Sequence, residues 1–243
     1  MFGSVNTADM MSKDLAAETE MIVVSVLYRL APEVQFPVQI KDCLAAVRWV
    51  KRYIEHFGGD RHRVALVGES AGGNLAVATA LFMGGSWFPL GGGGARRALC
   101  AVVAASPPVS YQHAVDGKGD ESDGEWRSYR RYWTGYGLSG GQMKGYWDAY
   151  LKKPQDGRNV LASPLRASKR QLRRLPPILL LRAAHEVLWD EITEMGRNIA
   201  DAGGEVEEMQ SQACIHGMYA KGSSACGVQS LERTGQFLKK HCG

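Results

Sequence analysis

Gly68-Glu69-Ser70-Ala71-Gly72 is a G-x-S-x-G pentapeptide that lies between two segments of different character. The short, apolar and β-branched run at 64–67 is typical of a buried strand, and the Ala- and Leu-rich residues 73–82 are typical of a helix. Small neighbours allow a tight turn between them, so that the hydroxyl stands clear of the sheet. This context favours a nucleophilic role for Ser70 over an ordinary Gly-rich turn.

Strand-like and helix-like segments alternate along the rest of the chain, which predicts an α/β fold with a mostly parallel sheet and helices on both faces. The expected strands are residues 21–26, 64–67, 101–105, 178–181 and 205–209. The expected helices are residues 38–57, 73–82, 191–202 and 228–240, and Gly-Gly pairs follow the first and third of them.

The connection between the strands at 101–105 and 178–181 is about 70 residues long, far longer than a simple strand–helix connection needs. We expect a cap or lid insertion at about 110–170 in a single domain covering 1–243. Its aromatic residues Tyr129, Tyr132, Trp133 and Tyr136 have the spacing of one helix face. Such a helix packs its rings on the domain or lines an apolar substrate pocket, and the two interpretations are compatible.

Composition favours a single globular domain and argues against nucleic-acid binding. The chain has 243 residues, 45% of them hydrophobic, which suits one domain with a substantial core. The formal net charge is +4, and the basic residues are scattered. The densest group, Lys169-Arg170 and Arg173-Arg174, is typical of a solvated surface. We therefore expect no nucleic-acid partner.

The cysteines and the apolar segments indicate in which cellular compartment the chain is expected. The five cysteines are odd in number and contain no C-x-x-C pair, so neither a disulfide framework nor a zinc site is expected, and Cys214 is interpreted as a small packing residue. This pattern favours a reducing, cytoplasmic compartment. No apolar run reaches the roughly 18 residues of a membrane span. The first residues lack the features of a signal peptide.

A serine hydroxyl needs a base and a carboxylate that orients that base. In chains with this kind of nucleophile turn, the acid and then the histidine follow the serine. His216 fits, since it lies beside Gly217 after the last expected strand. The competing histidines are His56 and His62, which precede the serine, His113, His185, which lies where the acid is expected, and the terminal His241.

Two carboxylates follow the strand at 178–181, Glu186 and Asp190. Asp190 directly precedes a helical pattern and is well placed as the N-cap of that helix. Glu186 is therefore the better candidate for the acid.

Together these segments resemble the hormone-sensitive lipase family, the α/β-hydrolase fold-3 carboxylesterases that include arylacetamide deacetylase. The resemblance runs from about Phe2 to the C-terminus. It rests on Tyr28-Arg29-Leu30-Ala31-Pro32-Glu33, Phe36-Pro37, Trp49, Gly59-Asp60, Gly68-Glu69-Ser70-Ala71-Gly72-Gly73-Asn74, Ser163-Pro164-Leu165, Pro176-Pro177, Asp190-Glu191 and Ile215-His216-Gly217.

The resemblance implies a serine esterase with Ser70 as nucleophile, His216 as base and Glu186 where the family usually has Asp. It implies no metal or organic cofactor and a small or medium hydrophobic ester as substrate. The sequence leaves open whether a membrane or a second copy is a partner.

The oxyanion hole is the main departure from the family pattern. The family has a His-Gly-Gly-Gly segment just before the residues that align with Phe2-Gly3-Ser4, and this chain begins after it. The resemblance therefore implies an N-terminally truncated chain that lacks several strands and part of the cap. The N–H group of Ala71 is the family oxyanion donor that is left. The alternative is a catalytically impaired remnant, or a ligand-binding member like the gibberellin receptors, which lack the histidine that is present here.

Overall fold

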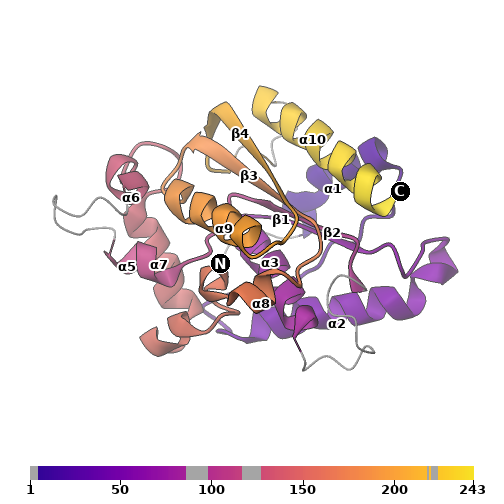
Figure 1. Cartoon of the computed structure of the whole chain (residues 1–243), viewed down its shortest axis with the longest axis horizontal. Helices are drawn as coiled ribbons and strands as arrows, with labels where there is room; N and C mark the ends of the chain where they lie inside the picture. The colour runs from indigo at the N-terminus through magenta and orange to yellow at the C-terminus, as the bar shows by residue number, and fades with distance from the viewer. Residues whose placement is uncertain (1–4, 86–97, 117–126, 218, 220–223) are drawn as a thin grey trace.

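The computed structural model describes residues 5–85, 98–116, 127–217, 219 and 224–243. Its centre is a parallel sheet of four strands in the order β1-β2-β3-β4 (Figure 1). The strands are β1 (Ala65–Glu69), β2 (Ala101–Ala105), β3 (Ile178–His185) and β4 (Val206–Ile215). β2 and most of β3 are apolar on both faces, as expected for parallel strands that are covered on both sides.

Helices cover both faces of this sheet. On one face α1 (Val5–Thr19) packs beside α10 (Ala225–Cys242), which is drawn in yellow in Figure 1. The other face carries α2 (Val38–Tyr53), α3 (Ala71–Gly84) and α9 (Trp189–Asp201). The core accordingly consists of two clusters: Val102, Leu180 and Ile192 belong to one, and Val103, Leu179 and Phe237 belong to the other. This layering confirms the α/β architecture expected from the alternating segments.

The described part of the long connection between β2 and β3 holds short helices and 3₁₀ turns. They are α5 (Tyr111–Asp116), α6 (Arg127–Arg131), α7 (Gly140–Tyr150), α8 (Lys169–Leu172) and the 3₁₀ turns η2 (Pro154–Arg158) and η3 (Pro164–Arg166). The expectation that the four aromatic residues lie on one face of a single helix is wrong. α6 ends at Arg131, and Gly135 and Gly137 have positive φ angles of 91° and 84° that a helix does not allow.

Two other elements differ from expectation. The expected helix at 38–57 ends as an α-helix at Tyr53 and continues as the 3₁₀ turn η1 (Ile54–Phe57), which Gly58 closes at a φ of 81°. The expected strand at 21–26 is not part of the sheet, since these residues have no ladder partner among the residues that the structure describes. β-Branched residues favour a strand, but a ladder also needs a neighbouring strand.

The expectation that the cysteines form no disulfides is also wrong. Cys100 is bonded to Cys242, with their Cα atoms 5.4 Å apart, and Cys214 is bonded to Cys226, with their Cα atoms 5.9 Å apart. Cys43 is free. Cys100 and Cys242 are 142 residues apart in the chain, and this pairing arises only because α10 lies along the sheet near the start of β2.

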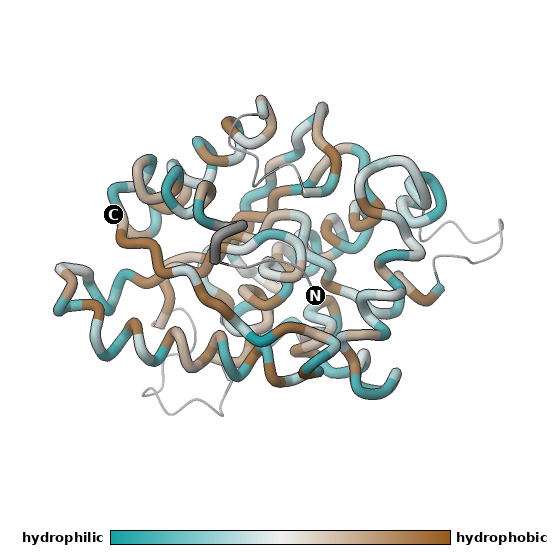
Figure 2. Tube along the Cα trace, turned by 180° about the vertical axis from the view of Figure 1, so that it is seen from behind, coloured by the Kyte–Doolittle hydropathy of each residue, from teal (hydrophilic) through white to brown (hydrophobic). Residues whose placement is uncertain are grey.

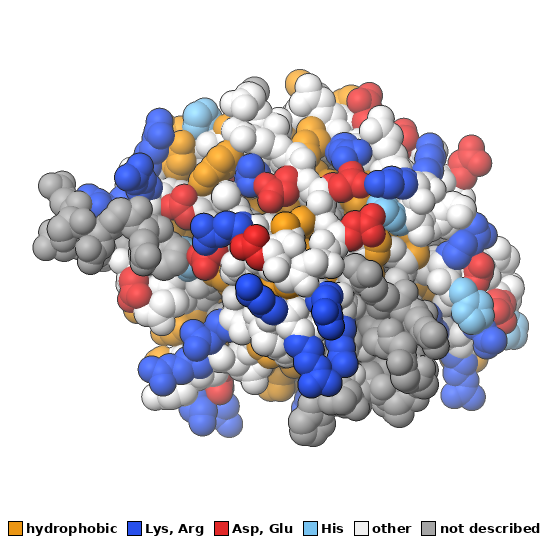
Figure 3. All heavy atoms as spheres, in the orientation of Figure 1, with side chains coloured by type: hydrophobic (Ala, Val, Ile, Leu, Met, Phe, Trp, Pro, Cys, Tyr) orange, Lys and Arg blue, Asp and Glu red, His pale blue; other side chains and the backbone are white. Residues whose placement is uncertain are grey.

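The surface agrees with the scattered charge pattern of the sequence. On the face shown in Figure 3, Lys and Arg side chains are interspersed with Asp and Glu side chains. Figure 2 shows hydrophobic segments running through the middle of the molecule, with mixed hydropathy along the outer helices. Within the described ranges, no helix has the length and hydrophobicity needed to cross a membrane.

Candidate active site

Ser70 forms a sharp turn between β1 and α3. Its backbone has a φ of 53° and a ψ of −121°, a combination that costs a residue with a side chain roughly 1–3 kcal/mol. The Ser70 N–H donates to the Ala105 carbonyl at 2.8 Å, which ties the turn to β2. The turn also needs small neighbours, since a Cβ atom added at Gly68 would lie 2.3 Å from the Gly72 backbone. The structure thus provides the strained turn that the pentapeptide predicts.

Three side chains from three parts of the chain meet at this turn. The Nε2 atom of His216, just after β4, lies 2.9 Å from the Ser70 Oγ atom. Its Nδ1 atom lies 3.1 Å from the Oε2 atom of Glu186, in the turn between β3 and α9. The structure therefore brings together all three residues that the sequence analysis selected as nucleophile, base and acid.

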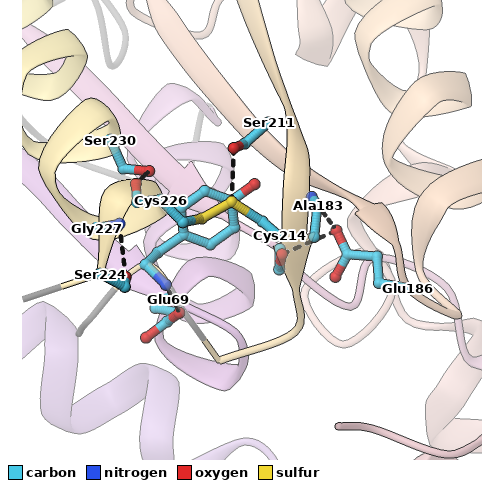
Figure 4. Close-up of a disulfide and its surroundings, with 11 residues drawn as sticks. Glu69, Ala183, Glu186, Ser211, Cys214, Ser224, Cys226, Gly227 and Ser230 are labelled. Carbon is cyan, nitrogen blue, oxygen red and sulfur yellow. Dashed lines mark hydrogen bonds between the residues drawn. A yellow bond between two sulfur atoms is a disulfide. The ribbon is translucent and has the colours of Figure 1, made fainter. Parts of the chain in front are cut away.

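Glu186 is completely buried and fully hydrogen-bonded. Its Oε1 atom accepts hydrogen bonds from the Ala183 N–H at 2.7 Å and from the Ser106 hydroxyl at 2.9 Å. Figure 4 shows the bond from Ala183. Because Oε1 is occupied by two donors, Oε2 is left for His216. These bonds fix a side chain that is one methylene longer than Asp.

Ser106 is a site residue that the sequence analysis missed. It directly follows β2, is buried, and has a positive φ of 43° that aims its hydroxyl at Glu186. Its own N–H donates to the Leu181 carbonyl at 2.8 Å, which holds it between β2 and β3. One feature of the sequence could have indicated Ser106. It follows the carboxyl end of β2, and β2 is the neighbour of β3, the strand that precedes Glu186.

Asp190 has a role that differs from the expected one. The residue at the N-cap of α9 is Leu188, and Asp190 lies within the first turn of the helix. Its Oδ2 atom accepts a hydrogen bond from the Ser128 N–H at 2.7 Å, while the Ser128 hydroxyl donates to the Val187 carbonyl at 2.8 Å. The N-cap expectation is therefore wrong, and Asp190 instead attaches α6 to the start of α9.

The insertion approaches the candidate site from the side of the histidine. A Cβ atom added at Gly137 would lie 3.1 Å from the His216 carbonyl oxygen, so the insertion backbone packs directly on the histidine loop. Tyr132 and Tyr136 lie with their ring centres 5.7 Å from that of His185, next to Glu186 in the chain. The insertion thus supplies aromatic surface near the acid and the base.

Polar contacts of Asn74 and Glu69 hold the elements around Ser70. The Asn74 side-chain amide on α3 donates to the Pro108 carbonyl at 2.7 Å and to the Ala162 carbonyl at 2.9 Å. Glu69 accepts a hydrogen bond from the Tyr219 N–H at 3.2 Å. Burial and the charges of Glu186 and Glu69 raise the pKa of Tyr219.

A disulfide links the two elements that precede and follow His216 in the chain. The Cys214–Cys226 disulfide joins the end of β4 to the start of α10, on either side of His216 in the chain (Figure 4). Cys214 was interpreted as a packing residue, and its bond to Cys226 corrects this view.

Ala71 is the first residue of α3, so its N–H has no acceptor within the helix. It lies directly after the Ser70 turn, where a backbone donor is available to an oxyanion. Among the residues that the structure describes, no group of three or more His, Cys, Asp or Glu side chains is arranged to hold a metal ion.

Residues 1–220 match the model of a family described as having the alpha/beta hydrolase fold. The chain belongs to this family. Its esterase and arylacetamide deacetylase relatives place the chain among the carboxylesterases that are like hormone-sensitive lipase.

The relatives include an arylesterase of Saccharolobus solfataricus, which is 29% identical over 98% of this chain and 71% of its own length. An ethyl acetate hydrolase of Pseudomonas putida is 29% identical over 91% of this chain and 63% of its own length. A thermostable esterase of Pseudomonas putida has a similar structure, with a TM-score of 0.85 and 28% identity, over 99% of this chain and 70% of its own. The chain therefore spans about two thirds of the length of these relatives.

Proposed function

We propose that this chain is a serine carboxylester hydrolase that uses Ser70, His216 and Glu186 as its catalytic triad. The observation that carries the proposal is the continuous series of contacts from Ser70 Oγ to His216 Nε2 at 2.9 Å, and from His216 Nδ1 to Glu186 Oε2 at 3.1 Å. A neutral imidazole with its proton on Nδ1 leaves Nε2 free to accept the serine proton.

The reaction follows from this geometry in two steps. Ser70 Oγ attacks the ester carbonyl while its proton moves to His216 Nε2, and Glu186 stabilises the imidazolium that forms. The Ala71 N–H donates to the oxyanion. Collapse of the tetrahedral intermediate expels the alcohol, which takes the proton from Nε2 and leaves an acyl group on Ser70. A water molecule then attacks the acyl group by the same sequence of proton transfers.

The proposed substrates are small to medium hydrophobic esters. Tyr132 and Tyr136 of the insertion lie close to the end of β3 that precedes Glu186, and the Gly137 backbone packs on the His216 carbonyl. Apolar and aromatic walls favour substrates with apolar acyl or alcohol groups. The names of the relatives, an arylesterase and an ethyl acetate hydrolase, support the same class.

A fluorophosphonate probe tests the proposal because it reacts preferentially with an activated serine. The wild-type chain should be labelled at Ser70, and Ser70→Ala should abolish labelling. His216→Ala should slow labelling by at least about 10²-fold, since the base is lost. Labelling of Ser70→Ala at the wild-type rate would assign the nucleophile to another residue.

A further inference from the structure

The segment from Lys152 to Arg174 has a strong excess of positive charge. It contains eight basic residues and one acidic residue, whereas the formal net charge of all 243 residues is only +4. The rest of the chain is therefore acidic on balance. The acidic residue, Asp156, accepts a hydrogen bond from the Lys153 N–H at 3.2 Å and so is engaged at the start of η2.

Seven of the eight basic side chains are exposed, and we call them the basic surface: Lys152, Lys153, Arg158, Arg166, Lys169, Arg170 and Arg173. None of the seven forms an ion pair with a carboxylate in the part of the chain that the structure describes. By contrast, Lys144 of the preceding helix α7 lies 2.6 Å from Asp148. Lys13 of α1 likewise lies 2.6 Å from Asp9. The positive charge of the basic surface is therefore not neutralised by these described residues.

Buried contacts hold the turns that carry the basic surface. The Ser163 hydroxyl donates to the Gly157 carbonyl at 2.7 Å, which joins η3 to η2. Leu172 of α8 is buried in the core, while Lys169 and Arg170 on the same helix are exposed. Positions 166, 169, 170 and 173 lie within eight residues, and Lys and Arg side chains gather over α8 in Figure 3. The charges are thus concentrated on one well-packed part of the surface.

The composition of this segment favours one kind of anionic partner. Between Leu151 and Leu175 there is no Phe, Tyr or Trp, so the bases of a single-stranded nucleic acid have no ring to stack on. With four residues, α8 is too short to read a major groove. Protein interfaces are enriched in aromatic residues and contain few lysines. An anionic bilayer requires none of these features, since its diffuse charge attracts every Lys or Arg side chain within a Debye length.

We propose that the basic surface binds peripherally to lipid bilayers that contain anionic phospholipids. Val160, Leu161 and Leu165 lie among the basic residues in the chain and are only partly buried. Their exposed apolar atoms can contact the interfacial region while the basic side chains contact the lipid phosphates and carboxylates. The combination of dense positive charge and a few apolar side chains is that of a surface that lies on a bilayer.

The basic surface is connected to the candidate active site. The Asn74 side-chain amide, on the helix that begins after Ser70, donates to the Ala162 carbonyl at 2.9 Å. Binding to a bilayer therefore brings the candidate nucleophile to the place where hydrophobic esters dissolve. This consequence rests on the proposed function, whereas the binding itself does not.

Vesicle co-sedimentation of the whole chain tests the proposal. The probe is phosphatidylcholine vesicles with about 30% phosphatidylserine, and the control is vesicles of phosphatidylcholine alone. We expect the partition coefficient to be at least about tenfold higher on the anionic vesicles. Raising the salt concentration from about 0.1 M to about 0.5 M should weaken this binding by at least about tenfold, because the charges are screened.

A variant locates the binding surface. It carries glutamine at four of the seven positions: Arg166→Gln, Lys169→Gln, Arg170→Gln and Arg173→Gln. The partition coefficient on anionic vesicles should fall by at least about 10²-fold, because four attractions to the lipid are lost. The melting temperature should stay near that of the wild type, since these side chains are exposed and unpaired.

The matched control removes the same net charge elsewhere. It carries glutamine at four exposed positions outside the basic surface: Lys13→Gln, Arg52→Gln, Arg61→Gln and Lys239→Gln. Its partition coefficient should stay within about threefold of the wild type, because these charges lie away from the contact and are screened.

Four results would overturn the proposal. Absence of binding to anionic vesicles excludes a membrane surface, and equal binding to neutral vesicles indicates apolar adsorption. Equal losses in the two variants show that only the net charge matters. Tighter binding to a DNA duplex than to the vesicles at the same salt concentration would assign the basic surface to nucleic acid. No ester is used in these measurements, so their failure leaves the proposed triad untouched, and failure of the triad leaves the membrane proposal untouched.

Discussion

At the scale of single residues, Glu186 is held more tightly than either of its partners in the proposed triad. It accepts hydrogen bonds from Ser106 and Ala183 on one oxygen and faces His216 with the other. Ser106 touches no reacting atom, so we interpret it as a positioning residue that acts through Glu186.

Ser106→Ala should lower kcat by about 10- to 100-fold, because a hydrogen bond to a charged group contributes roughly 1.5–3 kcal/mol. KM should change little, since substrate does not contact this hydroxyl. Steady-state kinetics with a p-nitrophenyl ester measures both values. Ser110→Ala is the control, since Ser110 is also buried but bonds to His113. An equal loss of kcat in the two variants would show that Ser106 supports only the stability of the fold.

Exchanging each carboxylate for its amide separates the proposed acid from Asp190. Glu186→Gln should slow acylation by at least about 10²-fold, because the imidazolium loses its charged partner. Asp190→Asn should keep most of the activity, since the Asn carbonyl oxygen still accepts from the Ser128 N–H. Burst kinetics gives the acylation rate of each. The reverse ranking would transfer the role of acid to Asp190.

The sequence identified Ser70, His216 and Glu186 because each follows an expected strand, where an α/β fold places its functional side chains. It could not identify Ser106. A serine after a strand is common, and its function depends on a φ of 43° and on a carboxylate 80 residues later in the chain. The N-cap expectation for Asp190 failed because helix boundaries shift by one or two residues and the carboxylate found a tertiary partner.

At the scale of elements, the contact between the insertion and the loop of His216 is made by backbone. Gly137 and Gly135 both have positive φ angles, but only Gly137 lies against the His216 carbonyl. Substitutions at these two glycines therefore separate the cost of backbone strain from the effect of the contact with His216.

Gly137→Ala and Gly135→Ala should both lower the free energy of unfolding by about 1 kcal/mol, since each forces a side chain into a left-handed conformation. Gly137→Ala should in addition lower kcat/KM by about tenfold, because its Cβ atom displaces His216. Urea denaturation and ester hydrolysis measure the two effects. If kcat/KM falls equally in both variants, the contact with His216 has no functional role.

Segments with strong local signals were predicted well, and segments that depend on neighbours were not. The strand at 101–105 and the helix after Ser70 are apolar enough to be assigned from composition and spacing alone. Residues 21–26 have the composition of a strand, but none of the described strands pairs with them. The aromatic residues 129–136 match helical spacing, yet two glycines with positive φ interrupt them.

At the scale of the whole molecule, buried ionisable groups make stability depend on pH. Burial lowers the pKa of His113 to about 3, so its 3.7 Å contact with Glu194 involves a neutral imidazole at pH 7. Burial raises the pKa of Glu191, so the effect of this carboxyl group on the pH dependence of stability is opposite to that of His113. Between the ordinary histidine pKa of about 6.5 and pH 3, the unfolded chain binds a proton at His113 that the folded chain does not, so this residue lowers stability as pH falls.

Removing the imidazole should therefore flatten or reverse this dependence. From pH 7 to pH 5, the free energy of unfolding of His113→Gln should fall less steeply than that of the wild type, by up to about 1.4 kcal/mol per pH unit. Urea denaturation at pH 8, 7, 6 and 5 measures both slopes, and the slope between pH 8 and pH 7 serves as the internal control. Parallel slopes below pH 6.5 would show that His113 is protonated in the folded chain.

The family was recognisable from the sequence because its motifs are spread over the whole chain, from Tyr28-Arg29 to His216-Gly217. The disulfides were not, because the chain has an odd number of cysteines and their spacing has no signature. Their pairing depends on how α10 packs against the sheet, which is a property of the whole fold.

The central claim is that Ser70 carries the acyl group during ester hydrolysis. The most direct measurement is acid quenching of the chain during turnover of a p-nitrophenyl ester, followed by intact-mass analysis and peptide mapping. We predict a mass increase of one acyl group on the peptide that contains Ser70, and none in Ser70→Ala. An acyl group on another residue, or turnover by the Ser70→Ala chain at the wild-type rate, would contradict the proposed mechanism.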